Sequence, residues 1–372
     1  MNELWTSRNT AFEKTISATT LRPSDKDIVH NLILSRLPTI DQPLAKAAAH
    51  HFSNPGKMLR ATMAMRGAHV LNVNLPAATR WAAAVEVLHN ASLVHDDICD
   101  GDKQRRGHQA IWTKFGRNVA LTLGDWLIAL SFELAAEAAE IVNSPRLLHI
   151  LAKHMSRTTA GEAMEFEWNG NLSWDAYLTI AADKTAPLLT APIQGVAVMI
   201  GDYQAEAIIS RYFRDLGEAY QIANDISNYN GSDGAKLIAG DLARRAPNAV
   251  TLSFIDGLNR DEKARFNNWY HSGDITDLAS WQAHILGSDA MQAASNRMFA
   301  TLDRATHHAS DLSAEISELV TPVHGLIMRV CATASKNGAV MTVGPASWRN
   351  PPRSNTCARP PIAESRSIKV TS

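Results

Sequence analysis

The sequence predicts an all-α protein built as one large helical body. From about residue 23 to about residue 335, apolar residues recur at spacings of three and four, which is the period of an amphipathic helix. The same stretch is rich in Ala, Leu, Met and Glu, which favour helices, and it contains few strand-like alternations. With 45% hydrophobic and 20% charged residues, the chain has the composition of a globular protein. We expect roughly ten to twelve helices.

Proline and serine residues mark where several of these helices should begin. Pro76 is expected in the first turn of a long helix that ends in an acidic cluster, and Pro145 is expected to open another helix. Ser173 stands in the N-cap position before the segment WDAYL. Pro187 is expected to kink a helix and to free some of its carbonyl groups.

Three regions are expected along the chain. Residues 1–22 form an N-terminal segment, residues 23–341 form the helical domain, and residues 342–372 form a tail. The tail combines a high density of proline with Arg and Ser, so it cannot continue a helix or bury much surface. We therefore predict that it is disordered.

Charge and composition exclude several classes of function. The chain has 36 Lys and Arg residues against 37 Asp and Glu residues, so no overall basic field attracts nucleic acid or anionic lipid. Its 3 cysteines lack metal-ligand spacing, which argues against a disulfide framework or a structural zinc site. No signal peptide or sufficiently long apolar run is visible, so we expect a cytoplasmic protein without stable membrane insertion.

An acidic cluster ends the predicted helix that begins near Pro76 and runs to about Asp100. At about 100° per residue, Asp96 and Asp100 lie one turn apart on one face, and His89 falls on the same stripe. Asp97 lies beside them. Carboxylates at the C-terminal end of a helix oppose its dipole, so a cation is needed to offset their repulsion. Magnesium binds carboxylate oxygens and shares its other positions with water and phosphate, so the cluster predicts a site for Mg²⁺ and a diphosphate.

Four basic residues could bind phosphate groups near this cluster. Arg105 and Arg106 follow it in a predicted turn, and guanidinium groups bind phosphate oxygens in a bidentate manner. Lys57 and Arg60 are three residues apart and are expected on one face of a helix that begins at Gly56. Taken alone, the second pair also fits an ordinary solvated helix face.

A second polar stripe lies within residues 215–236. Four residues with oxygen ligands occupy positions i, i+3, i+4 and i+7 between apolar residues, namely Gln221, Asn224, Asp225 and Asn228. They share one face of the predicted helix, and the opposite face can pack into a core. By itself, the stripe is also typical of an ordinary amphipathic helix.

The order of these motifs resembles that of the trans-isoprenyl diphosphate synthases, the polyprenyl synthetase family. The resemblance covers roughly residues 30–330 and is most specific in the block HDDICDGDKQRRG. The matching segments are, in order, Gly-Lys-x-x-Arg at 56–60, Asp-Asp-x-x-Asp at 96–100 followed by Arg-Arg-Gly, Gly-Asp-Trp-Leu at 124–127, Lys-Thr at 184–185 and Tyr-Gln-Ile-x-Asn-Asp at 220–225. The resemblance implies a single bundle of the isoprenoid synthase type with a central apolar cavity, and a homodimer.

The resemblance also implies a role for each candidate residue. Two or three magnesium ions would be bound by Asp96 and Asp100, with Asp97 in their hydrogen-bond shell, and from the opposite helix by Asn224, Asp225 and Asn228. The allylic diphosphate would be held by Arg105, Lys184, Thr185 and Lys236. Isopentenyl diphosphate would be held by Lys57, Arg60, His89 and Arg106, and Gln221 would lie near the forming bond. The implied reaction is ionisation of the allylic diphosphate, followed by attack of the isopentenyl double bond.

The second motif departs from the family pattern. Members of the family usually carry Asp-Asp-x-x-Asp there, whereas this chain has the amides Asn224 and Asn228 at two of the acidic positions. An amide offers magnesium an oxygen but no charge, although Asp233 and Asp241 could compensate. Two alternatives to a chain-elongating enzyme therefore stay open. One is a class I terpene cyclase on the same fold, and the other is a noncatalytic subunit of a heteromeric synthase.

Product length should follow from the depth of the apolar cavity beside the helix that carries Asp96. The nearest positions before Asp96, Ala91 and Ser92, have small side chains, so the cavity floor must lie deeper. The residues expected to form that floor are Val87, Leu88, Trp126 and Phe132. We therefore expect a C20 product, geranylgeranyl diphosphate, ahead of a C15 product.

Overall fold

The structure is a computed structural model that describes residues 23–168, 173–229 and 239–335. The predicted N-terminal segment, the predicted tail at 342–372 and the candidate ligand Lys236 lie outside the described residues. The domain boundaries at residues 22 and 341 therefore stay predictions.

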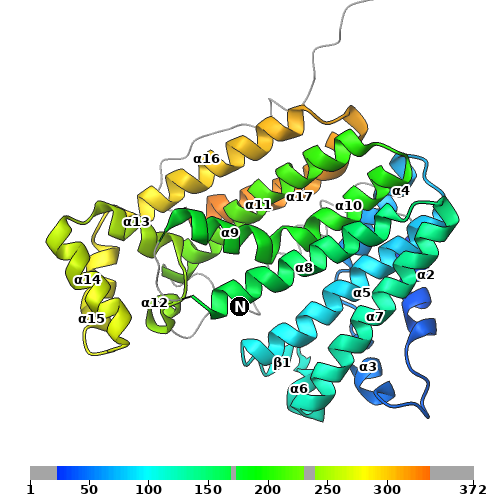
Figure 1. Cartoon of the computed structure of the whole chain (residues 1–372), viewed down its shortest axis with the longest axis horizontal. Coiled ribbons are helices and arrows are strands. Elements are labelled where there is room, and N and C mark those ends of the chain that lie inside the picture. Colours follow the sequence, from blue (N-terminus) through cyan, green and yellow to red (C-terminus); the bar gives the residue numbers. More distant parts are fainter. Residues whose placement is uncertain (1–22, 169–172, 230–238, 336–372) are drawn as a thin grey trace, which may run out of the picture. The chain divides into compact units, whose positions relative to one another are not determined.

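Helices make up nearly all of the described chain, as the sequence predicts (Figure 1). The first half contains α2 (Pro23–Arg36), α3 (Ala45–Phe52), α4 (Leu59–Val70), α5 (Leu75–Cys99), α6 (Ile111–Phe115), α7 (Arg117–Val142) and α8 (Arg146–Phe166). The middle contains α9 (Trp174–Thr185), α10 (Pro187–Met199), α11 (Tyr203–Tyr229), α12 (Gly240–Arg244) and α13 (Ala249–Gly257). The last part contains α14 (Arg260–Ser272), α15 (Leu278–Leu286), α16 (Ala290–Ser310) and α17 (Ala314–Ala334).

Most of the helix starts follow the local sequence signals. Pro76 lies in the first turn of α5, and Pro145 directly precedes α8. The side chain of Ser173 accepts a hydrogen bond from the backbone N–H of Ala176, which caps α9. Pro187 begins α10 immediately after α9, so it separates two helices where the sequence predicted a kink. These signals are local, and for that reason they can be recognised without the fold.

Three details of the prediction were wrong. The described residues contain 16 helices, more than expected, partly because helices as short as α6 and α12 produce no readable period. Helix α4 begins at Leu59, so Lys57 precedes the helix and does not share a helical face with Arg60. A two-residue hairpin was also missed. Its strands β1 (Gln104–Arg105) and β2 (His108–Gln109) are joined by Arg106 and Gly107, both with positive φ.

Helix α5 forms the centre of the first half of the bundle, where it packs along α7 and against α4 and α10 (Figure 1). Two glycines permit the close approach of neighbouring helices. An ideal Cβ on Gly124 of α7 would lie 2.1 Å from the ring of His95, and one on Gly195 of α10 would lie 2.1 Å from the buried ring of Trp81. Any larger residue would therefore push these helices apart.

Helix α7 is the one described helix that is long and apolar enough to cross a membrane. The core helix of a soluble protein can have the same length and apolar composition, so these two properties alone do not identify a membrane span. One face, including Leu123, Leu127, Leu134 and Ala138, is fully buried in the bundle. The expectation of no membrane insertion stays a prediction.

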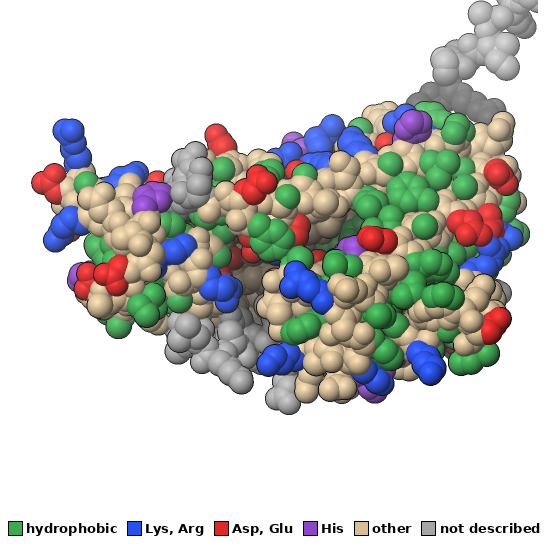
Figure 2. Space-filling view, turned by 60° about the horizontal axis from the view of Figure 1, so that its bottom comes forward, with side chains coloured by type: hydrophobic (Ala, Val, Ile, Leu, Met, Phe, Trp, Pro, Cys, Tyr) green, Lys and Arg blue, Asp and Glu red, His purple; other side chains and the backbone are tan. Residues whose placement is uncertain are grey.

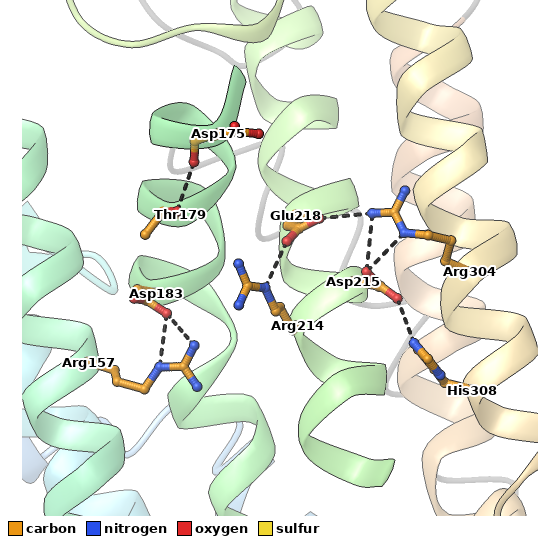
Figure 3. A network of polar contacts seen from close by, with 9 residues as sticks. All are labelled: Arg157, Asp175, Thr179, Asp183, Arg214, Asp215, Glu218, Arg304 and His308. Atoms are coloured by element: carbon orange, nitrogen blue, oxygen red, sulfur yellow. Dashed lines mark hydrogen bonds and ion pairs between the residues drawn. The ribbon is translucent and has the colours of Figure 1, made fainter. Parts of the chain in front are cut away.

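The second half of the bundle is held by ion pairs as well as apolar packing. Arg304 on α16 binds both Asp215 and Glu218 on α11, and His308 lies 3.5 Å from Asp215 (Figure 3). Arg214 completes the network by binding Glu218 within α11. Because Asp215 and Glu218 are buried, these pairs fix α11 against α16.

Candidate active site

The acidic cluster of α5 contains two carboxylates that are open to a ligand. Asp96 is half-buried and Asp100 is exposed, and neither makes a hydrogen bond or ion pair within the described part of the chain. Burial and the charge of Glu162 raise the pKa of Asp96 to about 7, against the opposing effect of Lys184. Burial also raises the pKa of Asp100. For Asp96 and Asp100 alike, burial therefore outweighs the attraction of the nearby cations Lys184 and Arg105.

Lys184 lies opposite these carboxylates, between two acidic residues of α8. Its Nζ is 3.1 Å from Glu162 Oε2 and 2.8 Å from Glu165 Oε2. Burial acts to lower the pKa of Lys184, but the two carboxylates outweigh it and raise the pKa. Gly161 permits this arrangement, since an ideal Cβ there would lie 2.6 Å from the backbone nitrogen of Lys184. Thr185 follows as the half-buried last residue of α9.

Three of the residues expected to bind isopentenyl diphosphate come together, namely the cations Arg60 and Arg106 and the imidazole of His89. Burial, with the charges of Arg60 and Arg106, lowers the pKa of His89 well below its usual value. Burial, with the charge of Arg106 and against that of Glu86, lowers the pKa of Arg60 to about 10. The Nη1 of Arg106 donates to the backbone oxygen of Asn54 (2.9 Å). Like charges held this close favour binding of an anion.

The local backbone shapes this cluster. Gly56 has a φ of +68°, and an ideal Cβ there would lie 2.8 Å from the guanidinium of Arg106. Lys57 follows Gly56 directly and is half-buried. Beneath the cluster, the buried Glu86 accepts a hydrogen bond from the backbone N–H of Ala61 (3.0 Å) in the first turn of α4. Glu86 therefore places a buried carboxylate beside the two cations Arg60 and Arg106.

Asp97 and Arg105 bind each other, although both were expected to face substrate or metal. The Nε of Arg105 donates to Asp97 Oδ1 at 2.7 Å, and its Nη2 contacts the same oxygen. Asp97 is buried, whereas Arg105 keeps part of its surface and also reaches Asp102 (3.4 Å). The pair joins the end of α5 to the hairpin that carries Arg106.

The second polar stripe is mostly engaged in contacts within the protein. Both carboxylate oxygens of the buried Asp225 accept hydrogen bonds, one of them from Gln221 Nε2 (3.0 Å). Burial raises the pKa of Asp225 well above its usual value, and the charge of Asp241 adds to this rise. Asn228 is buried and accepts from the backbone N–H of Asp241 (3.3 Å), whereas Asn224 is half-buried. Asn224 is thus the most accessible amide of the stripe.

A cavity of about 320 Å³, partly open to solvent, lies one helical turn below the charged groups. Ser92 precedes Asp96 by one turn of α5, and Thr158 precedes Glu162 by one turn of α8. The remaining lining residues are Leu88, His95, Ile128, Met155, Thr159 and Leu188. Its wall is therefore largely apolar, with hydroxyl groups near the charged end.

This lining corrects the expectation about the cavity floor. Leu88 lines the cavity as expected, but Val87, Trp126 and Phe132 are not among its lining residues. Val87 is fully buried in the core, as is Ala91, which had been expected beside Ser92 on the cavity wall. Val87 and Leu88 are consecutive residues of α5 and cannot share a face, and the cavity touches the face that carries Leu88 and Ser92. From α7 the cavity is lined by Ile128.

Sequence reasoning missed Glu162 and Glu165. Their spacing of three residues on a predicted helix could have shown that they share a face, but two acidic residues on a helix are usually solvated. Their role becomes visible only because α9 brings Lys184 between them. Glu86 was missed for the same reason, since its partners belong to another helix.

The donor set fits a divalent cation that is completed by substrate. Among the described residues, no three His, Cys, Asp or Glu side chains form a preformed metal site. Asp96 and Asp100 are nevertheless adjacent and unpaired, and an oxygen of Glu162 (Oε1) is buried without a hydrogen-bond partner. Magnesium commonly binds through one or two carboxylates together with substrate phosphates, which is what such an incomplete site provides.

The fold and the site together define an all-α protein with a cluster of charged residues next to a largely apolar cavity. A family model described as Polyprenyl synthetase matches residues 41–286. The geranylgeranyl diphosphate synthase of Mycobacterium tuberculosis is 30% identical over 244 residues, which cover 61% of this chain and 69% of that protein. The heptaprenyl diphosphate synthase component 2 of Geobacillus stearothermophilus is 29% identical over 278 residues, covering 71% and 82%.

A solved structure agrees with these sequence relatives. The crystal structure of a polyprenyl synthase from Caulobacter crescentus CB15, complexed with calcium and isoprenyl diphosphate, matches with a TM-score of 0.66 and 26% identity. The match covers 86% of this chain and 96% of that chain. The chain belongs to the polyprenyl synthetase family, the trans-isoprenyl diphosphate synthases, and is a trans-prenyltransferase.

Proposed function

We propose that the protein condenses isopentenyl diphosphate with an allylic diphosphate, head to tail and in the trans configuration, in a magnesium-dependent reaction. The observation that carries this proposal is the position of Asp96 and Asp100, open and unpaired, directly above the apolar cavity. An allylic diphosphate has the matching shape, because its charged head can lie at the carboxylates while its tail enters the cavity. The relatives whose names specify a product support this class of substrate.

In this proposal Asp96 and Asp100 would hold Mg²⁺, two or three ions in all, and when bound these ions would supply positive charge for the departing diphosphate. Lys184 adds a second positive charge on the opposite wall, where Glu162 and Glu165 hold it in place. The apolar cavity excludes water from the allylic cation until the second substrate attacks. No protein nucleophile is needed.

The second substrate is proposed to bind at the cations beside α4. Arg60, His89 and Arg106 are close enough to affect one another's charge, and Lys57 precedes the same helix. A terpene cyclase ionises one diphosphate and has no use for this second anion site. The intact cation cluster is therefore the observation that favours chain elongation over cyclisation.

We propose geranylgeranyl diphosphate as the main product, followed by the C15 product. The side chains of Ser92 and Thr158 are small and leave the upper cavity open, whereas Leu88 and Met155, one turn further down α5 and α8, narrow it. The names of the relatives specify products of different chain lengths. We therefore base the proposed product length on the residues that line the cavity.

One assay tests the reaction and its alternatives. The purified chain is incubated with isopentenyl diphosphate, Mg²⁺ and the C5, C10 or C15 allylic diphosphate, and the products are identified by mass. Linear C20 diphosphate is expected with each primer, and none after chelation of the metal. Cyclic hydrocarbons in a parallel reaction without isopentenyl diphosphate would instead identify a terpene cyclase. No product from any primer would favour a noncatalytic subunit of a heteromeric synthase.

We also propose a cytoplasmic homodimer. One face of α7 carries an apolar stripe formed by the exposed Leu121 and Ala129 and the half-buried Phe132 and Ala136, which the exposed Asp125 interrupts between the first two. Hydrophobic side chains gather on one exposed face of the molecule (Figure 2). Such a stripe suits contact with the same helix of a second copy, since a twofold axis brings identical faces together. Cell fractionation followed by immunoblotting tests the location.

A further inference from the structure

Asp225 is the most completely bonded side chain of the second polar stripe. It is 1% exposed, and three donors point at its two carboxylate oxygens. Its Oδ2 accepts from the hydroxyl of Tyr177 (2.6 Å) and from the backbone N–H of Ala249 (2.7 Å). Its Oδ1 accepts from Gln221 Nε2 (3.0 Å). Both carboxylate oxygens of Asp225 are therefore already bound by groups of the protein.

These donors come from three different helices. Tyr177 lies on α9, two turns before Lys184, and is itself buried. Ala249 is the first residue of α13, so its N–H is one of those that an α-helix cannot satisfy internally. Gln221 belongs to α11 together with Asp225. One carboxylate thus joins α9, α11 and α13 at a single point.

This arrangement leaves Asp225 poorly suited to bind a metal ion. Magnesium requires near-octahedral geometry with oxygens that are free to approach it, and it usually keeps several water molecules. A metal at Asp225 would have to displace buried donors, each of which would then lose a hydrogen bond to a charged group. Asp96 and Asp100 meet no such obstacle, because no described side chain is bonded to them.

We propose that Asp225 is a positioning residue that fixes α9, and with it Lys184, against α11, and that it is not a metal ligand. The Tyr177 hydroxyl is the connection, since it extends from α9 and donates to the carboxylate of Asp225 on α11. The identity of Lys184 as a diphosphate ligand rests on the proposed function, but the link between the three helices does not. In this arrangement the metal ions are held from the α5 side of the cavity.

The test compares Tyr177→Phe with Asp225→Asn, and uses Asp96→Asn as the matched metal-site control. Binding of Mn²⁺ in the presence of inorganic pyrophosphate is followed by electron paramagnetic resonance, and thermal unfolding is followed in parallel. Tyr177→Phe and Asp225→Asn are both expected to bind as many Mn²⁺ ions as the wild type while unfolding at a lower temperature. Asp96→Asn is expected to lose Mn²⁺ binding without loss of thermal stability.

Steady-state kinetics separate positioning from a purely structural role. Loss of the Tyr177 hydroxyl should raise the KM for the allylic diphosphate about tenfold, the size expected for loss of one buried hydrogen bond. The KM for isopentenyl diphosphate should stay unchanged, because its proposed ligands lie near α4. The double variant Tyr177→Phe/Asp225→Asn should be no worse than Asp225→Asn alone.

Two results would overturn the proposal. One is loss of Mn²⁺ ions in Asp225→Asn with full retention in Tyr177→Phe, which would make Asp225 a metal ligand. The other is an unchanged allylic KM in Tyr177→Phe, which does not depend on whether Asp225→Asn folds. A wild-type protein that binds no Mn²⁺ with pyrophosphate would refute the metal site of the proposed function, while the shared effect on unfolding would still test the link between helices.

Discussion

Asp96 carries its charge in surroundings that disfavour it. Burial and the nearby Glu162 raise the pKa of Asp96 to about 7. A carboxyl group whose pKa is higher in the folded than in the unfolded state stabilises the fold only while it is protonated. That contribution is complete below about pH 4 and is lost as the pH rises through 7. The metal site is therefore maintained at some cost in stability.

We predict that Asp96→Asn lowers the rate of product formation by roughly three orders of magnitude, because it removes a charged ligand at the departing diphosphate. In metal-free buffer at pH 8 the variant should unfold at the same temperature as the wild type or at a higher one. At pH 5 the difference in unfolding temperature should shrink. Differential scanning fluorimetry at both pH values and a product assay measure these effects.

The exposed Asp303 of α16 offers a control for this substitution. Asp303→Asn removes the same charge far from the cavity along the chain and should change neither the rate nor the pH dependence. Near-full activity of Asp96→Asn, or a lower unfolding temperature at pH 8, would contradict the assignment of Asp96.

For single residues, local relations could be predicted from the sequence, but contacts with distant residues could not. The spacing of Asp96 and Asp100 was sufficient to place both on one helix face, because that relation is local. The same reasoning could not tell that Asp225 is bound by Tyr177 and Ala249, which lie 48 and 24 residues away along the chain. Residue type predicts which groups can bind a metal, whereas the fold decides which of them are free to do so.

At the scale of the helices, the ends are less predictable than the interiors. The residue before α4, Met58, has a φ of 48° and provides no side-chain cap. The first turn of α4 is capped instead by Glu86, which reaches across from α5 to Ala61. A cap supplied by another helix leaves no local signal, and this explains why the predicted start of α4 was too early.

We predict that Glu86→Ala lowers the free energy of unfolding by about 1–2 kcal/mol, as expected for loss of a helix cap. Glu86→Gln keeps an acceptor oxygen for the Ala61 N–H and should lose less than half as much. Urea unfolding followed by circular dichroism measures both variants. Equal losses would show that Glu86 stabilises the fold through its charge beside Arg60 and Arg106.

The cavity occupies one face of α5, and adjacent residues of that helix should therefore respond differently. We predict that Ser92→Phe shortens the main product by about one five-carbon unit, because the ring fills the cavity near its charged end. Ala91→Phe is the matched control, since Ala91 is 1% exposed in the core. It should destabilise the fold by about 1–3 kcal/mol through overpacking, without shortening the product.

Mass analysis of the products and thermal unfolding of both variants test this difference. A shorter product from Ala91→Phe together with an unchanged product from Ser92→Phe would mean that the hydrocarbon chain runs along the neighbouring face of α5. The result would then restore the expectation drawn from sequence alone.

For the molecule as a whole, the fold class was predictable because helical periodicity survives in nearly every segment. The packing was not, since it depends on close approaches such as that of Gly195 to Trp81. The same limit applies to the network of α11 and α16, whose partners Asp215 and Arg304 are 89 residues apart (Figure 3). Motif order identified the family, but the contacts between distant segments had to come from the structure.

The proposed homodimer depends on the apolar stripe of α7. We predict that the purified chain alone is active and has a mass in light scattering of twice its 40.6 kDa. Ala129 lies exposed within this stripe, and Ala129→Arg should produce a monomer, because a charged side chain there opposes close helix contact. Ala283→Arg, at an exposed position of α15, should leave the dimer intact. A wild-type chain that is monomeric and inactive until a second protein is added would instead assign it to a heteromeric synthase.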